Sequence, residues 1–166
     1  MIKFSYHVYE IINASLFHRD RRDFSEFLLH HIVTITMVGY AYGTNIIPIG
    51  GPIMLVMDAS DVFVAVFKLT VDAYEKLQLT CFIMMLAGWF YFRLWFFPVY
   101  CMTEIWTQAN ATGHFSAIGV IKILFAFLCV LQILNLYWFW LMIRGLIRRL
   151  RESAEEKNKK TYYKMD

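Results

Sequence analysis

Two adjacent histidines and two aspartates one helical turn apart carry the clearest chemical signal in this chain. His30 and His31 lie in the segment HHIVT, and Asp58 and Asp61 lie in the segment MDASD. Both segments fall inside stretches apolar enough to cross a membrane, where each ionisable group costs about 2.5–3.5 kcal/mol to insert. We therefore expect these four side chains to have a function or a partner that offsets this cost.

The positions of the two pairs predict that they face each other across two helices. If antiparallel helices cover residues 24–44 and 49–71, the histidines lie roughly 10 Å and Asp61 roughly 15 Å from the same membrane surface. Asp58 and Asp61 share one helix face because they are three residues apart. An imidazole beside a carboxylate can act as an oriented general base, and an imidazole can also accept an activated acyl group.

Two other interpretations of these four residues stay open. Histidine and aspartate are metal ligands, but neighbouring histidines diverge by about 100° on a helix, so both cannot easily bind one ion. We therefore expect no metal. The cluster could instead be a buried polar network that only holds two helices together.

The composition predicts a polytopic membrane protein. Of the 166 residues, 59% are hydrophobic, against about 45–50% on a similar count in a soluble domain. Apolar runs of about 20 residues or more predict four transmembrane helices, over residues 24–44, 49–71, 77–101 and 117–147. A shorter helix over residues 2–17 either ends a span or lies in the interface. The predicted fold is thus an all-α, polytopic membrane helix bundle over residues 1–150, with a charged, solvent-exposed tail over residues 151–166.

The placement of basic residues predicts the orientation of the bundle. They fall at one end of the predicted helices, at Arg19, Arg21, Arg22, Lys76, Arg144, Arg148, Arg149 and Arg151. The opposite loops contain no lysine or arginine, so the basic end should face the cytosol or the mitochondrial matrix. These residues suit contact with membrane lipids. We expect no nucleic-acid partner, because the basic residues sit at membrane edges and no nucleic-acid-binding module is visible.

Residues 22–68 resemble the Lag1 motif of the ceramide synthases, within the TLC (TRAM–LAG1–CLN8) domain family. The shared positions are His30, His31, Thr34, Asn45, Gly50, Asp58, Ser60, Asp61 and Lys68. The segments FRLWFFP, with Arg93, and LQILNLYWFW, with Trp138, resemble later signatures of the same domain. The resemblance implies a barrel of at least six spans, of which this chain would be an N-terminally truncated form.

The resemblance also implies a reaction. In ceramide synthases an acyl chain passes from acyl-CoA, through a histidine, to the amine of a sphingoid base. Acyl-CoA would then be a substrate, with no resident cofactor. The catalytic residues would be His30, His31, Asp58 and Asp61, and the substrate-binding residues would be Thr34, Ser60, Lys68 and Arg93. The expected location is the membrane of the endoplasmic reticulum.

Departures from the family pattern support an alternative function. Met57 stands where the family usually has histidine before the first aspartate, and Asn135 replaces a later histidine. The alternative is a truncated, non-catalytic TLC-fold subunit with a structural or lipid-binding role in a larger membrane complex. Its location would be the endoplasmic reticulum or the mitochondrial inner membrane, and a protein partner would complete the bundle.

Overall fold

The fold is all-helical throughout the part of the chain that the structure describes, as predicted. A computed structural model describes residues 2–20, 23–44, 47–70, 74–111 and 115–162. Its elements are α1 (Ile2–Phe17), α2 (Phe24–Gly43), α3 (Ile47–Leu69), α4 (Glu75–Trp89), the π-helix η1 (Phe90–Met102), α5 (Thr103–Ala111) and α6 (Phe115–Tyr162). The first four predicted helices begin within about two residues of the observed ones, because polar and glycine-containing segments interrupt the apolar runs there.

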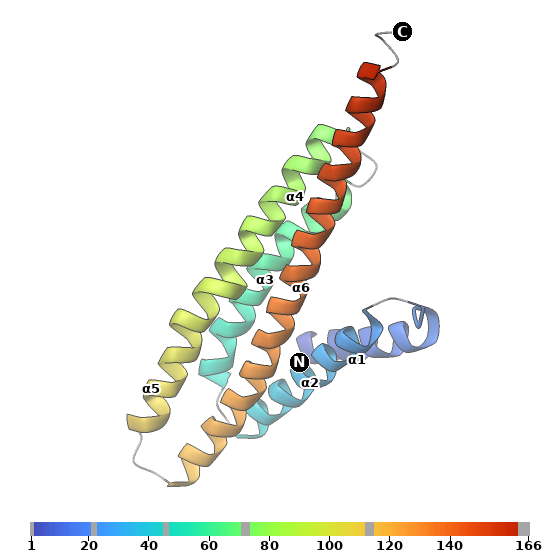
Figure 1. Cartoon of the computed structure of the whole chain (residues 1–166). Coiled ribbons are helices and arrows are strands. Elements are labelled where there is room, and N and C mark those ends of the chain that lie inside the picture. Colours follow the sequence, from blue (N-terminus) through green and yellow to red (C-terminus); the bar gives the residue numbers. More distant parts are fainter. Residues whose placement is uncertain (1, 21–22, 45–46, 71–73, 112–114, 163–166) are drawn as a thin grey trace.

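Three long rods form the body of the bundle. Figure 1 shows α3, the continuous rod made by α4, η1 and α5, and α6 running side by side. In the same view α1 and α2 form a hairpin that crosses the rods at an angle, and α2 packs against α6. The predicted antiparallel pairing of residues 24–44 with residues 49–71 is only a minor contact, because α2 packs mainly against α1 and α6.

The ends of the rods match the predicted charge arrangement in part. Arg149, in the C-terminal half of α6, donates a hydrogen bond to the side chain of Gln78, close to the start of α4. Ser153 Oγ lies 3.5 Å from Glu75 Oε1 in the same region. The first turn of α4, which carries Lys76, therefore lies beside Arg149 of α6.

The rod made by α4, η1 and α5, called the second rod below, contains a π-helix that was not predicted from the sequence. A single helix over residues 77–101 was predicted, whereas α4 gives way to η1 at Phe90. Pro98 lies inside η1. A proline has no N–H to donate and clashes with the carbonyl one turn earlier, so the regular helical ladder is disturbed there. Such π-helical turns occur often at functional sites, and η1 carries Arg93.

The last helix is longer than predicted. It was expected to end at residue 147, but α6 continues to Tyr162. Arginine and glutamate have high helix propensity, which does not depend on an apolar periodicity. The Nε atom of Arg148 also lies 4.0 Å from Oε1 of Glu152, one turn later. The proposed domain boundary at residue 150 falls inside this helix and stays a prediction.

Two helical stretches are long and apolar enough to cross a membrane among the described residues. They are Glu75–Gln108 and Gly119–Glu155. The four predicted transmembrane helices are therefore not all confirmed, and membrane crossing by α2 and α3 stays a prediction. Large apolar side chains nevertheless point outward on several helices, with Leu55 70% exposed and Ile133 65% exposed. An apolar outer surface suits contact with lipid.

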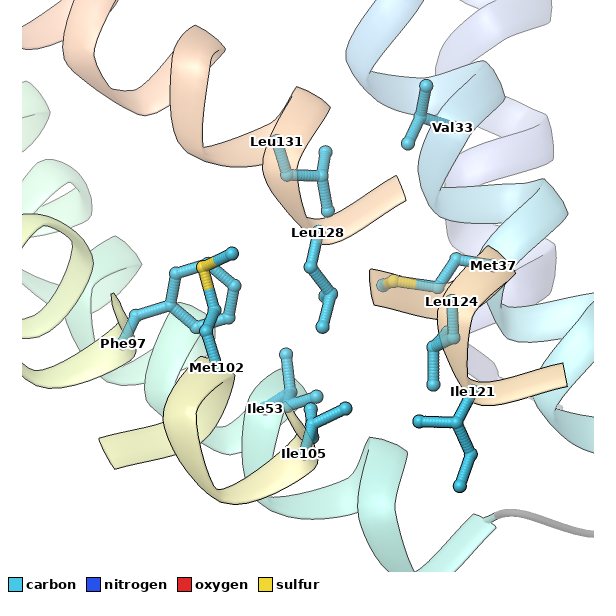
Figure 2. Packing of buried hydrophobic residues seen from close by; sticks show 10 residues of the cluster. All are labelled: Val33, Met37, Ile53, Phe97, Met102, Ile105, Ile121, Leu124, Leu128 and Leu131. Carbon is cyan, nitrogen blue, oxygen red and sulfur yellow. The ribbon is translucent and has the colours of Figure 1, made fainter. Parts of the chain in front are cut away.

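The apolar core lies where α6 meets α2, α3 and the second rod. Figure 2 shows its buried members, which are Val33, Met37, Ile53, Phe97, Met102, Ile105, Ile121, Leu124, Leu128 and Leu131. The α6 members recur at spacings of three and four residues, which places them on one helix face. Three core residues, Met37, Ile53 and Leu131, also line the cavity described below. The core thus forms part of the wall of the candidate site.

A close approach of α3 and α4 depends on Gly88. A Cβ atom at this position would lie 2.7 Å from Cδ2 and 2.9 Å from Cγ of Phe63. We expect Gly88→Ala to lower the free energy of unfolding by about 1–3 kcal/mol through overpacking, measured by thermal unfolding in detergent micelles. Gly145→Ala is the matched control, because no atom beyond the adjoining residues and backbone of α6 lies within 4 Å of its added Cβ. Equal stability of the two variants would contradict this account.

Candidate active site

A small cavity of about 70 Å³ collects most of the predicted site residues. Its walls come from α1, α2, α3, η1 and α6. The polar and ionisable residues that line it are Tyr6, His7, His30, Thr34, Asp58, Asp61, Arg93 and Asn135. The structure thus brings one histidine of the pair together with both aspartates.

His30 has a buried ring nitrogen without a partner. Its Nδ1 atom is shielded from solvent and makes no hydrogen bond. The ring stands edge-to-face against Trp138, with centroids 5.3 Å apart, and perpendicular to the ring of His31 at 5.4 Å. An unsatisfied buried polar atom costs about 1–3 kcal/mol. An unsatisfied atom on a cavity wall needs an explanation. A role of His30 in reaction or binding would explain it.

His31 occupies a different environment from its neighbour. It is 5% exposed and packs against Phe27, with ring centroids 4.2 Å apart. Its Nδ1 atom lies 2.9 Å from Nδ1 of His7 on α1, within hydrogen-bond distance. The two predicted catalytic histidines are therefore not equivalent, because His30 lines the cavity whereas His31 is packed behind it.

Arg93 is the most extensively bonded side chain of the site. It is 4% exposed, and its Nε donates to Ser60 Oγ at 2.5 Å. One terminal nitrogen donates to Asn135 Oδ1 at 3.2 Å, and the other forms an ion pair with Asp61. These bonds connect η1 to α3 and α6, so Arg93 and Ser60 hold three helices together. Their predicted contact with substrate is untested.

Aromatic packing completes the surroundings of the arginine. The guanidinium carbon of Arg93 lies 4.1 Å from the centroid of the Trp89 ring, in a cation–π contact. The indole Nε1 of Trp89 donates to the backbone oxygen of Asn135 at 3.2 Å. The second terminal nitrogen of Arg93 also reaches the backbone oxygen of Met57, at 3.3 Å. Charge-assisted bonds of this kind are the stronger class of hydrogen bond, and a buried arginine needs several of them.

The two other predicted substrate-binding residues lie in contrasting places. Thr34 lines the cavity, and its hydroxyl donates to the backbone oxygen of His30 at 2.7 Å. Lys68 is exposed near the end of α3. It lies seven residues after Asp61, or about 10 Å along the helix. The structure therefore does not bring Lys68 to the cavity.

Sequence reasoning missed two cavity residues on α1. Tyr6 and His7 line the cavity, but the predicted site began only at His30. The signal that singled out the histidine pair, a titratable side chain in an apolar helix, also applies to His7. Asn135 was noted as a departure from the family pattern, yet its place beside Arg93 depends on how three helices pack.

Comparison with known proteins identifies the family of this chain. Residues 1–144 match the TLC domain (TRAM–LAG1–CLN8). The chain belongs to the TLC domain family. This membership and the two apolar stretches of spanning length together indicate an integral membrane protein.

Several relatives of this TLC domain are named ceramide synthases. Ceramide synthase 4 of Mus musculus is 34% identical over 137 residues, which cover 80% of this chain and 34% of that protein. Ceramide synthase LOH2 of Arabidopsis thaliana is 27% identical over 165 residues, which cover 93% of this chain and 54% of that protein. The TLC domain described here thus spans between a third and a little over half the length of these relatives. The similarity connects it with lipid metabolism.

Proposed function

We propose that this chain carries the reacting centre of an N-acyltransferase of the ceramide synthase type. The reaction transfers an acyl group from acyl-CoA to the amine of a sphingoid base. One observation carries the proposal: His30, with a buried and unpartnered ring nitrogen, lines the same cavity as Asp58 and Asp61. The similarity to ceramide synthases supports the choice of substrates, with the endoplasmic reticulum as the expected membrane.

The chemistry divides into two steps. A ring nitrogen of His30 attacks the thioester carbonyl, the carbon–sulfur bond breaks, and CoA leaves as a thiol with the proton that the ring loses. The amine then attacks the acyl-imidazole, an amide bond forms, and the bond to the ring nitrogen breaks. The amine gives up one proton, which returns to the imidazole. Asp58 and Asp61 line the same cavity as His30 and are the carboxylates available to move these protons.

The size of the cavity limits what it can hold. A volume of about 70 Å³ is far below the roughly 300–1,000 Å³ of pockets that hold a drug-sized ligand. The cavity therefore suits the reacting carbonyl and amine. The acyl chain would lie along the apolar walls, which include Met37, Ile53 and Leu131, and extend toward the lipid.

Membranes that contain the chain should acylate a sphingoid base. The test supplies acyl-CoA and the base to membranes with no acyltransferase of their own, and mass spectrometry measures the amide. We expect the amide to appear only when both substrates and the chain are present. No amide from membranes that hold a folded chain would contradict the proposal.

Two observations favour the non-catalytic alternative. Asp61 is engaged by Arg93, and Met57 replaces the histidine usual before the first aspartate. If the cluster only stabilises the bundle, the chain would be a structural or lipid-binding subunit in the endoplasmic reticulum or the mitochondrial inner membrane. Purification in mild detergent should then yield a complex with a second protein chain. A folded, monodisperse monomer would contradict this alternative.

A further inference from the structure

We propose that His7 is a positioning residue of the site, a third histidine that fixes the orientation and proton position of His31. This inference rests on the proposed function. His7 lies on α1, outside the segment that carries the histidine pair and the aspartates. It lines the cavity together with His30, and its Nδ1 atom lies 2.9 Å from Nδ1 of the buried His31.

The chemistry of this contact fixes where the protons are. A hydrogen bond between two imidazole nitrogens needs one nitrogen that carries a proton and one that offers a lone pair. The Nδ1 atoms of His7 and His31 therefore take opposite roles, so the bond selects one tautomer of each neutral ring. In each neutral ring the protonation of Nδ1 then determines whether Nε2 carries a proton.

The rings of His7, His31 and His30 pack against one another, so the orientation of His31 affects the position of the His30 ring. The rings of His7 and His31 are 4.9 Å apart, and those of His7 and His30 are 6.2 Å apart. His30 stands perpendicular to His31 at 5.4 Å. His31, bonded to His7, thus forms part of the support for the His30 ring. A 1 Å displacement of a reacting group can reduce a rate by about 10²-fold.

Two variants separate the hydrogen bond from simple packing. His7→Leu fills the space without a polar atom, whereas His7→Asn keeps a polar atom at the distance of Nδ1 from the backbone. We expect His7→Leu to lower kcat for N-acyltransfer by up to about 10²-fold, through displacement of the reacting ring, with little change in KM for acyl-CoA. His7→Asn should restore kcat to within a few-fold of the wild type. His18→Leu is the matched control, because His18 is exposed and lies just beyond the same helix.

A second readout does not depend on activity. In protein labelled with ¹⁵N-histidine in micelles, the ring nitrogen shifts of His31 report its tautomer. They should change in His7→Leu but not in His18→Leu. Unchanged shifts in His7→Leu would overturn the inferred bond, and changed shifts with an unchanged kcat would overturn the positioning role. An inactive wild-type chain would contradict the proposed function and the catalytic relevance of His7, while the shifts would still decide the pairing.

Discussion

Asp61→Leu is expected to lower the free energy of unfolding by about 3 kcal/mol. The substitution removes the carboxylate that pairs with Arg93, whose side chain is only 5% exposed. Breaking a buried ion pair from one side costs about 3–5 kcal/mol, because the remaining charge is left buried without its counter-ion. We expect the lower end of this range, since the Asp61 side chain is 57% exposed and Asp58 remains as a second negative charge acting on Arg93. Arg93 also keeps its bonds to Ser60 and Asn135. Denaturant unfolding in micelles measures the change.

A double variant tests the cause of this loss. In Asp61→Leu/Arg93→Met both charges are gone, so no unpaired charge is buried. The double variant should be more stable than Asp61→Leu alone, although Asn135 loses a hydrogen-bond donor. A double variant as unstable as the sum of the two single variants would show that the pair is not coupled.

His30→Ala is expected to lower kcat for N-acyltransfer by about 10²–10⁴-fold. The imidazole is the group that lines the cavity and has a ring nitrogen without a partner. Its removal loses the ring contacts with His31 and Trp138, which lowers stability, and the loss of an unsatisfied buried atom offsets part of that decrease. The assay measures the amide formed from acyl-CoA and a sphingoid base, with unfolding measured on the same sample.

Lys68→Ala is the control for this variant. Lys68 belongs to the Lag1-like segment but is exposed and lies outside the cavity. The geometry therefore predicts wild-type kcat for Lys68→Ala. If Lys68→Ala lost as much activity as His30→Ala, the cavity would not be the reacting centre.

The helices could be predicted from the sequence better than their packing. Apolar runs locate α2 and α3 within about two residues, because the energetic preference for burying apolar surface is a local property of the chain. The end of α6 was missed because its last residues are charged and carry no apolar period. The crossing of α1 and α2 over the rods depends on which helix faces pack together, which residue spacing does not determine.

The candidate site could likewise be predicted only in part from the sequence. Depth along two helices was enough to bring His30 close to Asp58 and Asp61. The roles of Arg93 and Asn135 could not be read in this way, because their partners lie on three elements. The contact of His7 with His31 joins residues 24 positions apart, and nothing in the spacing of either residue specifies it.

The most direct test of the central claim, acyl transfer through His30, is to look for the acyl group on the protein. The wild-type chain is incubated with acyl-CoA without any amine, and its peptides are examined by mass spectrometry. We expect the peptide that contains His30 to gain the mass of the acyl group, and to lose it when a sphingoid base is added. His30→Ala should show no acylated peptide. Amide formation by His30→Ala at the wild-type rate, or an acyl group on a residue outside the cavity, would contradict the account.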